Sequence, residues 1–230
     1  MPDHAAIYRQ EAAKYDELIA KQPDLSAVLR KIKPFQGLDI VDMGAGTGRL
    51  SAILAPEAHS IVALDASEAM LEVTASRLCA AGLSNWRTQQ ADHRSLPLPD
   101  RSADLIVAGW TICYLANTGE REWEHHLAAI MAELERVLRP GGTIIILETM
   151  GTGTETPNPP AFLLPYYAAL TERYGFRHSW MRTDYTFDSP EQAEALTRFF
   201  FGDLIADRVK VERLRSVPEC AGIWVKSSGI

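Results

Sequence analysis

Cysteine is scarce in this chain of 230 residues, and its three cysteines stand far apart. Cys79, Cys113 and Cys220 form no C-x-x-C pair and no Cys/His cluster with the spacing of a zinc site. This pattern excludes a disulfide framework and a structural zinc site of the usual kind. We therefore expect three free thiols in a protein of a reducing compartment.

Long apolar runs and basic runs are also missing. No segment approaches the roughly 20 apolar residues that cross a bilayer, and residues 1–10 are polar and charged, unlike a signal peptide. The 23 Lys and Arg are outnumbered by 30 Asp and Glu, giving a net charge of −7, and no basic cluster stands out. We expect a cytoplasmic protein with neither a membrane nor a nucleic-acid partner. The oligomeric state stays open.

The most distinctive pattern is a glycine-rich turn after a short apolar run. Residues 38–50 read L-D-I-V-D-M-G-A-G-T-G-R-L, which predicts a buried parallel strand, a tight loop and a helix. Glycines allow such a loop to approach a ligand closely. Dinucleotide-binding proteins have G-x-G-x-x-G/A here, but this chain has Gly48 one residue early and Arg49 in the last position. By itself, the loop also fits an ordinary turn between a strand and a helix.

Strand-like and amphipathic segments alternate along the rest of the chain. We predict strands at 38–43, 60–64, 86–90, 104–109, 143–147, 178–187 and 219–226, and helices at 5–32, 47–56, 67–81, 119–138, 161–175 and 190–210. This alternation predicts an α/β fold with a doubly wound, mostly parallel, seven-stranded sheet and helices on both faces. A small helical and aromatic insertion is expected after the fifth strand.

Two acidic residues follow predicted strands. Asp65 ends the second strand about 20 residues beyond the glycine loop, where an acidic residue can accept hydrogen bonds from ribose hydroxyls. Asp92 follows the third strand. Ligands of open parallel sheets bind at the carboxyl ends of the strands, so these residues should meet the glycine loop. Taken singly, each also fits a helix cap or a surface turn.

Four elements agree in type, order and spacing with one enzyme family. They are D-x-G-x-G-x-G at 42–48, Asp65, Asp92, and the turn L-R-P-G-G-T at 138–143. Over residues 33–150 the chain resembles the class I S-adenosylmethionine (SAM)-dependent methyltransferases. The resemblance implies SAM as the cofactor and S-adenosylhomocysteine (SAH) as its product. The cofactor-binding residues that it implies are Tyr15, Asp42, Gly44, Ala45, Gly46, Asp65, Ala66, Met70, Asp92, His93 and Gly109.

With this family in view, we expect a single methyltransferase domain over 1–230. It would comprise a helical cap at 1–35, a cofactor-binding core at 36–150, a lid-like insertion at 151–176, and the final strands and helix at 177–230. Aromatic side chains should line the acceptor pocket: Trp110, Tyr114, Tyr8, Tyr15, Tyr166 and Tyr167. Each of these also fits plain packing. Arg182 could bind an anionic acceptor or pair with Asp184, and Glu148 is a possible base, so no catalytic residue is assigned and no metal is expected.

Several absences favour a small-molecule acceptor. The fourth strand is followed by G-W-T-I-C-Y, without the Asn/Asp-Pro-Pro-Tyr signature of amide- and adenine-methylating relatives, and no reactive-cysteine pair is present. Methylation of RNA or protein and a non-catalytic SAM-binding role remain alternatives. Aminopropyl transfer needs an acidic cluster for a polyamine. It is disfavoured because no such cluster follows the fourth strand.

Overall fold

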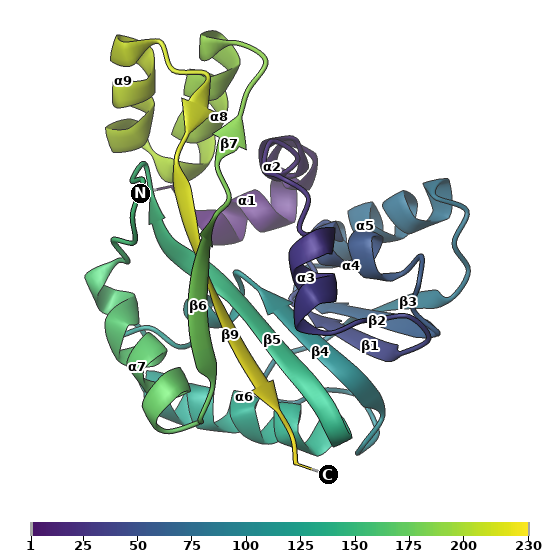
Figure 1. Ribbon diagram of the computed structural model, residues 1–230. Helices are drawn as coiled ribbons and strands as arrows, with labels where there is room; N and C mark the ends of the chain where they lie inside the picture. The colour runs from purple at the N-terminus through teal and green to yellow at the C-terminus, as the bar shows by residue number, and fades with distance from the viewer. Residues whose placement is uncertain (1, 230) are drawn as a thin grey trace.

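A computed structural model describes residues 2–229 of the chain, which are organised around a seven-stranded sheet (Figure 1). Its strand order is β3-β2-β1-β4-β5-β9-β6. The strands are β1 (Asp39–Met43), β2 (Ser60–Asp65), β3 (Trp86–Gln90), β4 (Ala103–Gly109), β5 (Leu138–Thr152), β6 (Arg177–Arg182) and β9 (Glu219–Ser227). Only β9 runs antiparallel to its neighbours. The predicted doubly wound, mostly parallel, seven-stranded sheet is confirmed.

Helices cover both faces because the central strands bury both sets of alternating side chains. On β4, Leu105 and Val107 pack with α3 (Ser26–Ile32), α4 (Arg49–Leu54) and α5 (Glu68–Ala80). Ile106 and Ala108 point to the other face, which α6 (Trp123–Val137) and α7 (Leu164–Glu172) cover. The apolar runs that predicted buried strands therefore fill two cores, one on each face.

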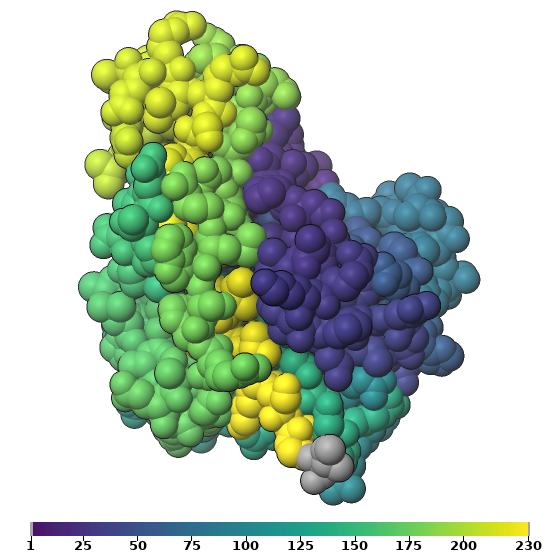
Figure 2. Space-filling view, viewed as in Figure 1, coloured from purple at the N-terminus to yellow at the C-terminus, as the bar shows by residue number. Residues whose placement is uncertain are grey.

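A third apolar cluster lies beyond the carboxyl ends of the central strands. It joins Leu18 of α2 (Ala12–Ile19) to α8 (Pro190–Phe201) and α9 (Asp203–Glu212). The short pair β7 (Tyr185–Thr186) and β8 (Ser216–Val217) completes it. In the space-filling view the purple N-terminal segment lies between this yellow-green part and the blue part that holds β2 and α5 (Figure 2). The first and last quarters of the chain thus meet above the sheet.

Several predicted boundaries differ from the structure. The segment 5–32 forms three helices, α1 (His4–Gln10), α2 and α3. The helix predicted at 190–210 is divided by Gly202, whose φ of 84° belongs to no helix. β5 continues to Thr152 instead of ending at residue 147, because β9 pairs with it from Thr143 to Thr152. Between residues 2 and 229, no helix has both the length and the apolarity to cross a membrane.

The helical segment after β5 packs on the sheet. Tyr166 and Tyr167 of α7 are buried and belong to the core cluster on the α6 face, where Tyr167 contacts Trp224. The prediction that these tyrosines line an acceptor pocket is wrong, because they point into the core. The segment between β6 and β9 lies above the strand ends instead.

Candidate functional site

A cavity of about 480 Å³ lies at the carboxyl ends of the central strands. It adjoins the point between β1 and β4 where the strand order reverses, which is where open α/β sheets bind ligands. All eleven residues expected to bind a cofactor line it: Tyr15, Asp42, Gly44, Ala45, Gly46, Asp65, Ala66, Met70, Asp92, His93 and Gly109. The volume is within the range of small-molecule sites.

The glycine loop is held in a conformation that side chains would prevent. Gly44 has a φ of +71°, and a Cβ there would lie 2.0 Å from Oγ1 of Thr111. The amides of Gly44 and Ala45 both donate to the carbonyl oxygen of Leu64, at 2.7 and 2.8 Å. The backbone therefore reaches the cavity surface directly, as a close-binding loop requires.

Asp65 connects this loop to the end of β2. Its carboxylate accepts hydrogen bonds from the amides of Gly46, at 2.9 Å, and Ser67, at 2.8 Å. Each carboxylate oxygen keeps a further lone pair, so the group can still accept bonds from a ligand. Ser67 caps α5.

Asp42 lies below the loop and is almost fully buried. Its Oδ2 accepts a hydrogen bond from Oγ of Ser51 at 2.6 Å, whereas its Oδ1 has no partner among the described residues. Burial raises the pKa of Asp42 to about 7. A cationic donor in the cavity would satisfy this carboxylate.

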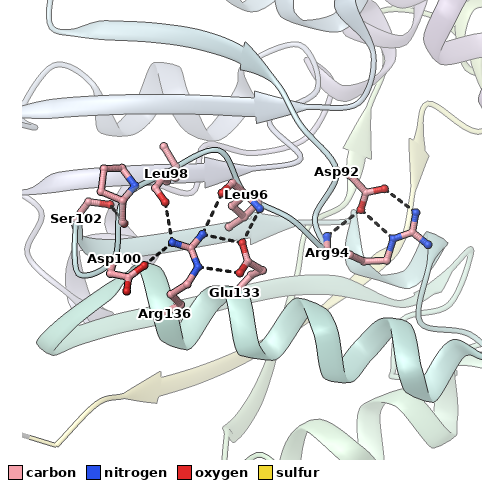
Figure 3. Close-up of polar contacts among 9 residues, drawn as sticks. Asp92, Arg94, Leu96, Leu98, Asp100, Ser102, Glu133 and Arg136 are labelled. Carbon is pink, nitrogen blue, oxygen red and sulfur yellow. Dashed lines mark hydrogen bonds and ion pairs between the residues drawn. The ribbon is translucent and has the colours of Figure 1, made fainter.

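The loop after β3 is braced from α6, as Figure 3 shows. Arg136 donates to the carbonyl oxygens of Leu96, at 3.0 Å, and Leu98, at 2.7 Å, and Glu133 accepts from the amide of Leu96 at 2.6 Å. Asp92, at the start of this loop, pairs with Arg94, which lowers the pKa of the aspartate to about 2. A ligand amino group would therefore share the Asp92 carboxylate with a guanidinium, a partner that the sequence analysis did not foresee.

His93 lies next to Asp92 and is buried. One ring nitrogen, Nε2, lies 2.8 Å from Oγ1 of Thr111, and Nδ1 is buried without a partner among residues 2–229. Burial lowers the pKa of His93, which favours the neutral ring. The pair formed by His93 and Thr111 supports the underside of the glycine loop.

An aromatic cluster closes the cavity over the loop; it consists of Tyr8, Tyr15, Tyr114, Phe200 and His4. Tyr8 packs edge-to-face on Tyr15 and Tyr114, with centroid distances of 5.2 and 5.7 Å. A Cβ on Gly46 would lie 3.9 Å from Tyr15, so this ring faces the loop. Tyr8, Tyr15 and Tyr114 line the cavity as expected.

Trp110 also lines the cavity, directly after β4. Its φ of +52° is uncommon for a bulky residue, and such strain concentrates at functional sites. The guanidinium of Arg49 lies 5.0 Å above its ring and donates to Gln22 and to the carbonyl oxygen of Pro23. No carboxylate within residues 2–229 lies at ion-pair distance from Arg49.

Contacts decide the roles of the two remaining candidates, Glu148 as a possible base and Arg182 as an anion-binding residue or a partner of Asp184. Glu148 is fully buried, accepts from the amide of Cys113 and the hydroxyl of Tyr166, and does not line the cavity. Arg182 is paired with Asp184 at 2.6 Å and lies outside the cavity.

Several cavity residues were not predicted. Phe201, Tyr185, Thr149, Thr152 and Glu219 line it. The run F-F-F-G at 199–202 is a signal that could have been noticed, because three adjacent aromatic residues cannot all face one core. Nothing local distinguishes Glu219 in the sequence.

No group of His, Cys, Asp and Glu side chains able to hold a metal ion was found in the described part of the chain. The polar groups that converge on the cavity suit an organic ligand. Backbone amides, carboxylates and aromatic rings form its walls.

Known proteins resemble this chain in sequence and in fold. Residues 41–146 match the family model described as a methyltransferase domain. A demethylmenaquinone methyltransferase of Clavibacter sepedonicus is 37% identical over 122 residues, which cover 53% of this chain and 45% of the relative. The chain spans about half the length of the curated relatives it matches.

Solved structures share the fold at low sequence identity. A SAM-dependent methyltransferase from Aquifex aeolicus superposes with a TM-score of 0.59 at 17% identity, covering 93% of this chain and 97% of the other. The cyclase SpnF gives the same TM-score at 18% identity, covering 90% and 80%. Together, the domain match over residues 41–146, the strand order and the solved structures show a methyltransferase domain with the class I fold, whose methyl donor is SAM.

Proposed function

We propose that this protein transfers a methyl group from SAM to a small molecule held in the same cavity. The observation that carries the proposal is the convergence of eleven family-type positions and an aromatic cluster on one cavity of about 480 Å³. Residues on β1, β2, β4 and the loop after β3 contribute, although they are distant in sequence.

The residues fit SAM group by group. The backbone of Gly44 to Gly46, which lines the cavity, would receive the methionine part, and the unpaired oxygen of Asp42 would accept a hydrogen bond from its amino group. Asp65 would accept from the ribose hydroxyls. Met70 and the backbone at His93 would enclose the adenine ring. These roles are part of the proposal.

The protein's contribution to the reaction is alignment and exclusion of water. Bound SAM supplies an activated methyl group and a neutral leaving group. Trp110 and Tyr114 line the cavity and would orient the acceptor for in-line attack. Such orientation can lower a barrier by roughly 7–11 kcal/mol when the geometry is good.

A small acceptor is favoured over RNA or a protein. The aromatic cluster and Phe201 cover the cavity, and the chain carries a net charge of −7. A polynucleotide needs an open, positively charged groove. The relative from Clavibacter sepedonicus is a demethylmenaquinone methyltransferase, which supports a small acceptor for this chain as well.

The fold alone does not decide between transfer and mere SAM binding, since the cyclase SpnF shares it. Purified protein should therefore be incubated with SAM carrying a labelled methyl group and a fractionated pool of metabolites. We expect label in a low-molecular-weight product and none in added RNA or protein. A protein that binds SAM yet labels no fraction would support the non-catalytic role instead.

A further inference from the structure

One carboxylate in the cavity has no role in the proposed cofactor site. Glu219 begins β9 opposite Thr152 of β5, lines the cavity and is only 2% exposed. Its amide donates to Oδ1 of Asp184 at 3.1 Å, and its carbonyl oxygen accepts from the amide of Thr183 at 2.8 Å. The backbone therefore holds this residue firmly in place.

The Glu219 carboxylate is only half satisfied. One oxygen, Oε1, accepts a hydrogen bond from Oγ1 of Thr149 at 2.8 Å. The other, Oε2, is buried and has no hydrogen-bond partner within residues 2–229. Within that range, no Lys or Arg lies at ion-pair distance from it, although Arg49 lines the same cavity. Buried carboxylates are normally paired with hydrogen-bond donors, and Oε2 of Glu219 lacks such a donor.

Glu148 provides an internal comparison. It is the same residue type, is equally buried, and also ends with one unpaired oxygen. However, the hydroxyl of Tyr166 and the amide of Cys113 hold it in the core, and it does not line the cavity. Of these two buried glutamates, only Glu219 is placed to meet a ligand.

The surroundings of Glu219 indicate the charge of that ligand. Six aromatic side chains line the same cavity: Tyr8, Tyr15, Tyr114, Tyr185, Phe200 and Phe201. Ring faces attract cations, and a carboxylate in a largely apolar site binds an ammonium group with a charged hydrogen bond. An anionic acceptor would be repelled by Glu219.

We propose that Glu219 binds the acceptor, and that the acceptor is a small primary or secondary amine. This inference rests on the proposed methyl transfer and names its substrate class. The carboxylate would accept a proton from the bound ammonium group. The freed nitrogen lone pair then forms the N–C bond to the methyl group while the S–C bond breaks, and its electron pair stays on sulfur as SAH. The proton on Glu219 leaves to water when the methylated ammonium product departs.

The environment of Glu219 makes this proton transfer reasonable. Burial raises the pKa of Glu219 to about 7, so it is a stronger base than an ordinary carboxylate. The charged and titratable groups that face it are Asp184, Tyr185, Tyr167, Cys220 and Arg49. Amine binding should therefore strengthen as the pH rises through about 7.

The test compares three probes with one skeleton on SAH-saturated protein: 2-phenylethylamine, 2-phenylethanol and 3-phenylpropionate. By calorimetry, we expect the amine to bind at least about tenfold more tightly than the other two, the effect of one charged hydrogen bond. Glu219→Gln should abolish that preference and leave SAH affinity within about twofold. Glu148→Gln, the matched control, should keep both the amine preference and the SAH affinity of the wild type.

The contradicting results are distinct. Equal or undetectable binding of the probes to wild-type protein, or an amine preference that survives Glu219→Gln, overturns the amine assignment. Weakened SAH binding in Glu219→Gln would make this residue part of the cofactor site, and also overturns it. If wild-type protein binds no SAH, the proposed function fails and the acceptor assignment fails with it; the probe comparison on the free protein then decides only whether Glu219 binds an amine.

If Glu219→Gln does not fold, a second measurement, on the wild-type protein alone, tests the same proposal. Between pH 8 and pH 5.5 the amine probe stays protonated, so a loss of its affinity reports on the protein. We expect that loss in wild-type protein for the amine and not for 2-phenylethanol, which controls for His4 and His93 in the same cavity. Parallel pH profiles for the two probes would contradict the proposal.

Discussion

At the scale of single residues, three buried carboxyl groups set the character of this protein. Asp42, Glu148 and Glu219 each have a pKa raised to about 7 by burial. Two of them line the cavity and one lies in the core beside it. Placing such groups near a site carries a stability cost at neutral pH, which is typical of residues retained for function.

The core member of this set gives a stability prediction. For Glu148, burial raises the pKa in the folded protein to about 7, above the 4.5 that is usual for a glutamate. Its contribution to stability is therefore fully present below about pH 4.5 and is lost as the pH rises through 7. The difference in unfolding free energy between Glu148→Gln and wild type should therefore shift by about 2–3 kcal/mol in favour of the variant when the pH rises from 5 to 8.

Urea denaturation of both proteins at the two pH values measures this difference. Glu172→Gln, at an exposed position at the end of α7, should show no such gain and serves as the control. A difference between Glu148→Gln and wild type that is the same at pH 5 and pH 8 would contradict the proposed ionisation of Glu148.

At the scale of elements, the loop after β3 depends on a helix that is distant in sequence. Arg136 and Glu133 of α6 hold the backbone of residues 96–98. Asp92 and His93 stand at the start of the same loop and line the cavity. The cofactor site is thus supported from the far face of the sheet, where α6 packs.

Removal of this support should weaken cofactor binding, although the substituted side chain does not contact the cofactor. We expect Arg136→Met to lower SAH affinity by about three- to tenfold, the effect of losing positioning bonds worth ~1 kcal/mol. Arg139→Met is a matched control, because Arg139, like Arg136, pairs with two carboxylates, but its partners Asp39 and Asp104 lie at the opposite ends of the strands. Calorimetric titration measures both; equal SAH affinities for the two variants would show that the brace is only structural.

Elements were predictable where the pattern is local. The apolar runs of β1, β4 and β5 and the amphipathic pattern of α6 led to the correct sheet and layers, because burial on one or two faces leaves a periodic trace. The extension of β5 to Thr152 and the break at Gly202 were not predictable. Both depend on pairing or packing with segments more than 40 residues away.

At the scale of the whole molecule, the site has a predictable half and an unpredictable half. The cofactor half could be predicted, because it is built from strand ends and a glycine loop whose spacing can be read in the sequence. The acceptor half is built where α1 and α2 meet α8 and the start of β9, so Phe200 and Glu219 reach the cavity only through the complete fold. Tyr166 and Tyr167 were misplaced for the same reason.

This division also explains why the family is clearer than the acceptor. The match to the methyltransferase domain spans residues 41–146 and so leaves out α1, α2, α8 and β9, the elements that build the proposed acceptor half. The relatives therefore say more about the methyl donor than about the molecule that receives the methyl group.

The central claim is that this cavity binds SAM through Asp65 and the glycine loop. Calorimetric titration of the folded protein with SAM and with SAH tests it most directly. We predict binding of both, weakened at least about tenfold by Asp65→Ala, which removes the charged acceptor. Asp188→Ala, at a surface position whose side chain is 78% exposed, should bind as wild type does. A folded wild-type protein that binds neither SAM nor SAH would contradict the account.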